Sequence, residues 1–202
     1  MQYIIQLVIL LFSAIVHEVM HGVVAEKLGD DTARVEGRIT LNPLPHIDPF
    51  GSVLLPLFLM LVGSPVILGA AKPVPVNFNN LRNPKRGMAL VSLAGPLSNL
   101  GLAILFAIPL KLGLVTTLSA EILVQAVLIN LVLFVFNLIP IPPLDGSKVL
   151  AALAPDRIMY QILSWERYGF ILVFAFLYLG VLDRILVPII LLFSRILGIS
   201  FF

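Results

Sequence analysis

Residues 3–28 read YIIQLVILLFSAIVHEVMHGVVAEKL, and this stretch decides what kind of protein the chain can be. It is mostly apolar as far as Val16 and then carries His17, Glu18 and His21. A run of about 20 predominantly apolar residues is long enough for a helix to cross a bilayer. No basic residues precede the run, and ionisable groups stand where a cleavage site would be expected. We therefore expect a retained membrane helix and not a signal peptide.

The composition supports a membrane protein. Of the 202 residues, 59% are hydrophobic and 12% are charged, and the mean hydropathy is +1.07. A soluble domain is roughly half apolar and roughly a quarter charged, so the composition excludes a soluble hydrolase and makes the lipid bilayer an expected partner. No basic stripe alternates with aromatic residues, so we expect no nucleic-acid partner. The chain has no Cys, which excludes disulfides and thiolate metal sites.

Further apolar stretches predict an all-α polytopic membrane protein with about 4–6 membrane helices. We expect one domain over residues 1–202, with a core at about 3–155 and C-terminal membrane segments at about 165–200. The last stretch is interrupted by Asp183, Arg184 and Pro188, so it is either one span with a surface helix or a tight pair. The other apolar stretches are residues 50–71, 87–112 and 120–139, and a short polar helix is expected from residue 146 to about 167.

Two segments predict departures from simple spanning helices. Residues 33–41, ARVEGRITL, alternate between polar and β-branched or apolar residues, which predicts a short strand or hairpin at the membrane surface. Residues 50–71 are apolar but broken by Pro56, Gly63 and Pro65. Such breaks are tolerated in a membrane where the backbone is buried in protein, and we expect this segment to be re-entrant.

The pentapeptide His17-Glu18-Val19-Met20-His21 has the pattern H-E-x-x-H. Residues four apart lie on one face of a helix, so the two imidazoles can bind one metal while Glu18 reaches a water as general base. The alternative is a polar helix end that is solvated at the membrane surface. Ionisable groups inside a membrane segment are costly and mark functional sites, which favours the metal.

A catalytic zinc site needs a third protein ligand. Asp145 stands out because a proline-rich turn precedes it and ends a membrane stretch, which leaves irregular backbone that can line a polar cavity. On the residues alone, an ordinary surface turn capped by Asp145 remains open. The other candidates are His46, which we expect to be a hydrogen-bonded surface residue, and Asp48, Glu166 and Asp183.

Three motifs occur in order: HEVMH at 17–21, GPLSN at 95–99 and NLIPIPPLDG at 137–146. Together they resemble the site-2 protease family of intramembrane metalloproteases, over roughly residues 3–155. The stretches GRITLNPLPHIDPFG and AKPVPVN resemble its compact bacterial branch, and no insert of the size of a PDZ domain interrupts the chain.

The resemblance implies roles for single residues. His17, His21 and Asp145 match the family's ligands for one zinc ion per chain, and Glu18 matches its general base. Asn137 matches a side chain that polarises the scissile carbonyl, a role that suits an amide donor in a dry site. A helix C-cap is the structural alternative for Asn137.

Two further asparagines are candidates for substrate binding. Asn99 ends the motif GPLSN, where small residues also let helices pack closely, so a packing role beside the active site is the alternative. By the same resemblance, Asn77 belongs to an edge that pairs with an unwound substrate, and strand addition would hold a peptide extended for cleavage.

We therefore expect a protease that hydrolyses peptide bonds in or near the transmembrane segments of membrane-protein substrates. A metal transporter and a non-catalytic scaffold remain alternatives. Paired repeats typical of transporters are absent from the sequence, and a scaffold would be expected to have lost Glu18 or a histidine.

The topology follows from the number of membrane crossings and from the positions of the basic residues. The histidine pair and Asp145 share a metal only if residues 3–28 and 120–139 run in the same direction, and this holds if residues 50–71 do not span. The loops on both sides of residues 50–71 are basic, so the positive-inside rule places them in the cytoplasm. We expect a multi-pass plasma-membrane protein whose site faces the cytoplasmic side. The basic residues are Lys27, Arg34, Arg38, Lys72, Arg82, Lys85 and Arg86.

Overall fold

The computed structural model describes residues 2–54, 57–58, 61 and 71–199, and within these residues it contains helices and no strand. The all-α membrane class is confirmed at this level. The longer helices are α1 (Gln2–Leu28), α2 (Thr32–Val35), α4 (Pro84–Lys111), α5 (Thr117–Asn137), α6 (Asp145–Leu153), α7 (Asp156–Ser164), α8 (Gly169–Tyr178) and α9 (Val181–Leu197). Short turns of helix are η1 (Leu44–His46), η2 (Pro49–Leu54), η3 (Phe78–Asn80) and η4 (Trp165–Tyr168).

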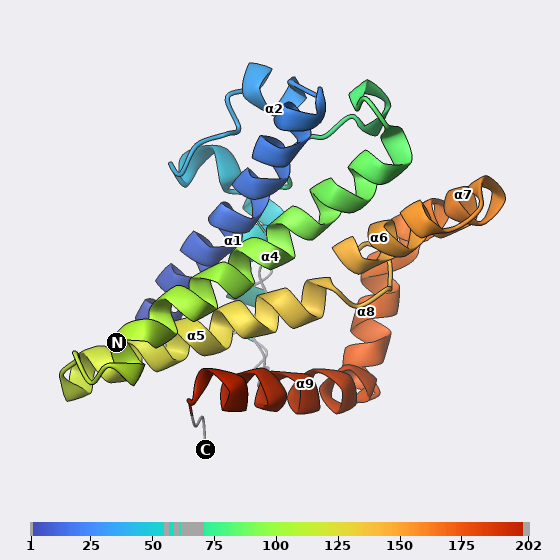
Figure 1. The fold of residues 1–202 in the computed structure, drawn as a ribbon. Helices are drawn as coiled ribbons and strands as arrows, with labels where there is room; N and C mark the ends of the chain where they lie inside the picture. The colour runs from blue at the N-terminus through green and yellow to red at the C-terminus, as the bar shows by residue number, and fades with distance from the viewer. Residues whose placement is uncertain (1, 55–56, 59–60, 62–70, 200–202) are drawn as a thin grey trace.

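Helices α1, α4 and α5 form the body of the molecule, with α4 in contact with both of the others (Figure 1). α1 and α5 run in one direction and α4 runs in the other. In the described part of the chain these three helices are long and apolar enough to cross a membrane, and a fourth span results if residues 156–178 and α9, which meet at 77°, are counted as one. Three is below the range of about 4–6 that we expect from the sequence, and four is its lower end.

The ends of α4 and α5 are set by local sequence. Asn83 caps α4 by accepting a hydrogen bond from the Arg86 amide, and Pro84 occupies the first turn, where its missing N–H costs nothing. Gly113 then adopts a positive φ of 65° after the end of α4. Thr116 and Ser119 form a reciprocal capping box that starts α5. The short connection makes α4 and α5 antiparallel neighbours.

The largest apolar core lies between α4, α5 and α9. On α4 it is built from the small residues Ala103 and Ala107, which let α5 approach closely, and Phe134 of α5 meets Phe193 of α9 edge to face at 5.3 Å between ring centroids. Large apolar side chains elsewhere on α1, α4 and α8 are exposed. A soluble protein does not tolerate so much exposed apolar surface, and lipid contact accounts for it. Examples are Tyr3, Ile4, Val8, Leu105, Phe170 and Ile171.

The structure corrects the predicted hairpin at residues 33–41. Thr32–Val35 form the helical turn α2, and the rest of the segment is irregular. The alternation does not separate a buried from an exposed face, because Val35 is 77% exposed while Arg38 is 6% exposed. The reason is tertiary: the Arg38 guanidinium donates to the carbonyls of Lys72 and Pro73, which draws it into the protein.

The single polar helix expected from residue 146 to 167 is divided into α6, α7 and η4, because Pro155 forces Ala154 into an extended conformation with ψ 158°.

The predicted re-entrant segment, residues 50–71, lies for the most part outside the described residues, which omit 55–56, 59–60 and 62–70.

Candidate metal centre

Two helical stripes face each other where α1 crosses α4. Residues four apart project from the same side of a helix, and in each stripe every fourth residue takes part in the contact. Because the helices are antiparallel, the C-terminal member of one stripe meets the N-terminal member of the other. The α1 stripe is Ser13, His17 and His21, and the α4 stripe is Val91, Gly95 and Asn99.

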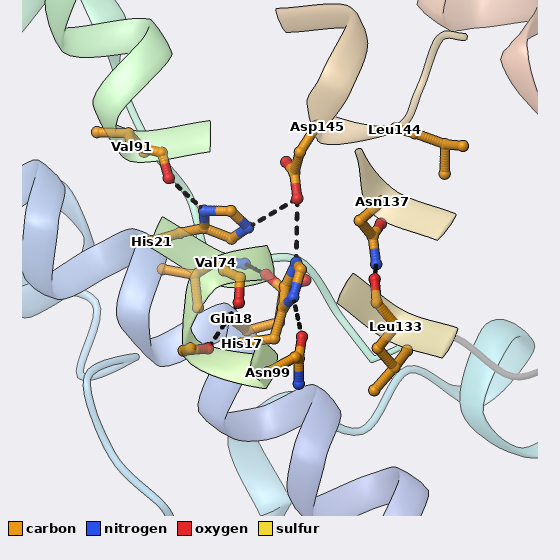
Figure 2. A network of polar contacts seen from close by, with 12 residues as sticks. His17, Glu18, His21, Val74, Val91, Asn99, Leu133, Asn137, Leu144 and Asp145 are labelled. Carbon is orange, nitrogen blue, oxygen red and sulfur yellow. Dashed lines mark hydrogen bonds and ion pairs between the residues drawn. The ribbon is translucent and has the colours of Figure 1, made fainter. Parts of the chain in front are cut away.

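Asp145 completes a three-residue cluster with the two histidines (Figure 2). Its Oδ2 lies 3.1 Å from His17 Nε2 and 3.3 Å from His21 Nε2, and all three side chains are buried. In a tetrahedral zinc site with bonds of about 2.0–2.1 Å, neighbouring ligand atoms are about 3.3 Å apart. The cluster therefore has the donor set and spacing of a three-ligand zinc centre. In the described part of the chain it is the one group of His and Asp or Glu residues with this convergence.

Both histidines are oriented by α4. His17 Nδ1 lies 2.7 Å from Asn99 Oδ1, and His21 Nδ1 lies 2.7 Å from the Val91 carbonyl oxygen. The rings stand edge to face, with an interplanar angle of 83° and 4.7 Å between centroids. Histidine ligands commonly donate their second N–H to a carbonyl or carboxylate, which fixes the ring and its tautomer. Here that arrangement leaves both Nε2 atoms for the metal.

Gly95 provides the space between the two rings. A Cβ atom added at Gly95 would lie 2.5 Å from His17 Nε2 and 2.5 Å from His21 Nε2. Both distances are well below the closest approach of a methyl carbon and a ring nitrogen, so a methyl group would overlap the Nε2 edges of both imidazoles, where the metal binds. The glycine of GPLSN is therefore part of the site.

Asp145 is the first residue of α6 and is placed by the turn that follows α5. Gly146 allows this placement, because a Cβ at that position would collide with the Leu138 carbonyl at the end of α5. Burial raises the pKa of Asp145, but the hydrogen bonds with His17 and His21 outweigh it and hold the pKa well below its usual value. A carboxylate that stays ionised suits a metal ligand.

Glu18 is half-buried beside the two histidines, and its Oε2 accepts a hydrogen bond of 2.8 Å from the Val74 amide. Val74 belongs to an irregular segment, residues 71–77, that forms neither helix nor strand. Arg38 holds the beginning of this segment, as described above. The Glu18 carboxylate therefore lies between α1 and the backbone of residues 71–77, which we call the strap.

Asp30 fastens the other end of the strap and was not predicted as a structural residue. It is fully buried just after α1 and accepts hydrogen bonds from the Asn77 amide at 2.8 Å and from Asn80 Nδ2 at 3.0 Å. Burial raises the pKa of Asp30, but the hydrogen bonds from Thr32, Asn77 and Asn80 outweigh it and hold the pKa below its ordinary value. The sequence signal for this role was the position of Asp30 directly after Gly29, where α1 ends and a polar side chain can bind nearby backbone amides.

Asn137 lies at the end of α5, beside Asp145 and Leu144 (Figure 2). Its Nδ2 donates to the Leu133 carbonyl at 2.9 Å. An amide nitrogen carries two hydrogens, so this bond does not exhaust its donors. The residue is half-buried, and its position is compatible with both roles that the sequence left open.

The other candidates lie outside the ligand cluster. Asn77 is exposed, and its side chain accepts a hydrogen bond from the Asn79 amide. His46 is not the surface residue that we expected: it is fully buried, and its Nε2 bonds to the Thr40 carbonyl at 2.8 Å because the loop folds over it. Asn99 is also fully buried, and its amide binds protein groups, as the packing alternative expects.

Comparison with known proteins identifies relatives. A family model described as Peptidase family M50 matches residues 110–179, which include the motif at 137–146 that contains Asp145. A Bacillus subtilis protein named "Putative zinc metalloprotease YwhC" is 40% identical over 171 residues, which cover 80% of this chain and 74% of that protein. A Mycolicibacterium smegmatis protein named "Putative zinc metalloprotease Rip2" is 29% identical over 94% of this chain and 73% of its own length. No solved structure matches the chain.

Proposed function

This chain belongs to peptidase family M50, the site-2 protease family, and we propose that it is an intramembrane zinc endopeptidase. Its substrates are membrane proteins, cleaved in or beside their transmembrane segments. The observation that carries the proposal is the convergence of His17, His21 and Asp145 on one point, with Glu18 beside them. The three ligand atoms lie within 4.8 Å of one another and leave one tetrahedral position open.

The residues divide the reaction between them. Zinc, when bound by His17, His21 and Asp145, supplies a Lewis acid that makes water acidic enough to attack at neutral pH. Glu18 takes the proton of the attacking water and later delivers it to the leaving amine. The Val74 amide holds Oε2 of Glu18 and leaves Oε1 to carry that proton. Burial of the site keeps bulk water away from these charges.

The test of the proposal is a comparison of Asp145→Ala with His46→Ala. Purified wild-type protein is expected to hold one zinc per chain and to cleave a single-span model substrate in proteoliposomes. Asp145→Ala removes one of three ligands, so zinc content and cleavage are both expected to fall to near zero. His46→Ala leaves the ligand set intact and is expected to keep its zinc and its cleavage activity.

Metal content is measured by atomic emission and cleavage by the appearance of product bands. Zinc loss in His46→Ala with retention in Asp145→Ala would overturn the ligand assignment. One zinc per chain without cleavage of any membrane substrate would favour a metal transporter or a non-catalytic scaffold.

Asn137→Ala is expected to lower the catalytic rate by about 10²–10³-fold and to change KM little. The reason is that an amide donor aimed at the developing oxyanion acts on the transition state and not on the bound substrate. Steady-state cleavage over a range of substrate concentrations measures both constants. A rise in KM at unchanged kcat would show that Asn137 only binds substrate.

A segment beside Glu18 suits the binding of an unwound substrate. Residues 71–77 form neither helix nor strand and are held at both ends, by Arg38 and by Asp30, and Asn77 has extended backbone angles. We propose that a substrate strand pairs along this segment as it approaches the metal, and that Asn77 belongs to that edge.

The topology that we propose is multi-pass in the plasma membrane, with the metal toward the cytoplasm and residues 50–71 re-entrant. Two observations support it: α1 and α5 run in the same direction, and basic residues cluster where α1 ends and α4 begins. A cysteine at Asn79, in the exposed loop before α4, is expected to resist a membrane-impermeant thiol reagent on intact cells and to react after lysis. The chain has no native Cys to confuse the readout. Labelling of intact cells would rule out this orientation.

A further inference from the structure

Behind His17 lies a chain of buried polar groups that leads away from the metal site. Asn99 on α4 and Asn130 on α5 are fully buried, and Ser13 on α1 is 1% exposed. Buried polar side chains in a membrane protein are costly unless they are paired, and they mark functional positions. The chain of hydrogen bonds connects three helices and ends on the Nδ1 atom of His17.

The direction of the Asn99 amide is determined by its partners. Its nitrogen lies 3.2 Å from the Ser13 carbonyl oxygen and 3.0 Å from Asn130 Oδ1. A carbonyl oxygen only accepts hydrogen bonds, so the Nδ2 side of Asn99 must face Ser13. Oδ1 of Asn99 therefore faces His17, and because that oxygen can only accept, Nδ1 of His17 must carry a hydrogen.

The direction of the Asn130 amide is determined in the same way, one layer further out. Its nitrogen donates to the Ala126 carbonyl at 2.9 Å, four residues earlier on α5, and to the Ser13 hydroxyl at 2.9 Å. Its Oδ1 is then turned toward Asn99 and accepts from it. Two backbone carbonyls, on α1 and on α5, thus fix the orientation of both amides.

We infer that Asn99 and Asn130 are positioning residues that act in series to set the tautomer and ring orientation of the ligand His17. With the hydrogen fixed on Nδ1, the lone pair of His17 is on Nε2, where the metal binds. The inference rests on the metal site of the proposed function. His21 needs no such device, because a backbone carbonyl, that of Val91, receives its Nδ1–H directly.

The competing explanation is that the network only joins helices. Polar side chains between membrane helices stabilise helix association, and this role alone would affect folding and leave metal affinity unchanged. The two explanations differ in what happens at the metal, so the decisive measurement is metal affinity and not proteolysis.

The test uses purified full-length protein titrated with zinc against a chromophoric chelator, and cobalt(II) as a spectroscopic probe of ligand geometry. Asn99→Leu keeps the volume but cannot accept from His17, so zinc affinity is expected to fall about 10–100-fold and the cobalt spectrum to change. Asn99→Asp keeps an acceptor for His17, but its second oxygen faces two acceptors, the Ser13 carbonyl and Asn130 Oδ1, so it has to carry a proton there. In that neutral form it is expected to bind zinc within about threefold of wild type.

Asn130→Leu tests the second layer without touching His17. It is expected to weaken zinc binding by less than Asn99→Leu does, about threefold to tenfold. Because Asn130 acts through Asn99, the double variant Asn99→Leu with Asn130→Leu is expected to bind zinc no more weakly than Asn99→Leu alone. The two effects would then be non-additive. Ser13→Ala is the matched control: it removes the hydroxyl but keeps the Ser13 carbonyl, so affinity should stay within about twofold of wild type.

Wild-type zinc affinity and cobalt spectrum in Asn99→Leu, with only a lower melting temperature, would overturn the inference in favour of helix packing. If Asn99→Leu does not fold, two other variants decide the question: Asn130→Leu alone, and Asn99→Asp combined with Asn130→Leu. In that double variant the acceptor remains on residue 99, so zinc affinity near that of Asn99→Asp supports the series order, and a further tenfold loss contradicts it. Absence of zinc and cobalt binding in the wild type would refute the metal site itself, and cleavage by metal-loaded wild type is scored separately.

Discussion

Glu18→Gln is expected to retain one zinc per chain and to lose about 10²–10⁴-fold in cleavage rate. Glu18 is not in the ligand cluster, and His17, His21 and Asp145 are unchanged by the substitution. The glutamine carbonyl oxygen can still accept the Val74 N–H that now binds Oε2, so the strap at residues 71–77 keeps its contact. What the amide cannot do is take a proton from water.

The measurement is zinc content together with initial cleavage rate in proteoliposomes. Glu26→Gln is the matched control, because Glu26 lies two turns further along α1 and pairs at 2.7 Å with Arg34 away from the ligands. That variant should cleave at the wild-type rate, since half-exposed ion pairs contribute little. Cleavage by Glu18→Gln at the rate of Glu26→Gln would show that Glu18 is not the general base.

Gly95→Ala is expected to abolish zinc binding and, with it, all cleavage. The added methyl carbon would lie 2.5 Å from both ligand Nε2 atoms, which is too close for either imidazole to stay where it is. The rings cannot move away without losing their partners on α4, the Val91 carbonyl and Asn99. The loss should therefore exceed the about 100-fold that removal of an outer hydrogen-bond partner costs.

Gly101→Ala is the control for helix propensity, because Gly101 is also on α4 and a Cβ there has no heavy atom within 4 Å. Alanine is favoured over glycine inside a helix by about 1 kcal/mol, so Gly101→Ala should be at least as stable as wild type and fully loaded with zinc. Chelator competition and thermal unfolding of both variants separate the loss of metal from the loss of fold. One zinc per chain in Gly95→Ala would show that the rings do not converge as the structure has them.

The spanning helices could be predicted because each follows from the local sequence. The expected segments 3–28, 87–112 and 120–139 correspond to α1, α4 and α5 with ends that differ by at most three residues. Caps such as Asn83 and the Thr116–Ser119 box explain most of these shifts. The alternation in residues 33–41 was misleading, because Arg38 is held by carbonyls 34 and 35 residues away, which no local pattern contains.

The ligand residues could be predicted for a different reason. The four-residue spacing of His17 and His21 fixes their common face, and the turn before Asp145 was recognisable by its prolines. The sequence did not contain the pairing of α1 with α4, and the roles of Gly95, Asn99 and Asn130 depend on it. The signal that was available is weak: Asn130 is a lone amide in an apolar helix, and Val91, Gly95 and Asn99 repeat the spacing of the histidines.

Because the histidine ligands and their partners lie on both antiparallel helices, zinc binding depends on how α1 and α4 are aligned along their axes. One turn of an α-helix is about 5.4 Å, so sliding α4 by one turn would withdraw the Val91 carbonyl and Asn99 from both rings at once. The same slip would replace Gly95 between the rings with a residue that has a side chain, because its neighbours in the stripe are Val91 and Asn99. Bound zinc therefore selects one alignment of the two helices out of those that a smooth apolar interface would tolerate. Bilayer strain that moves α1 and α4 past each other would therefore be expected to lower zinc affinity before it separates the helices.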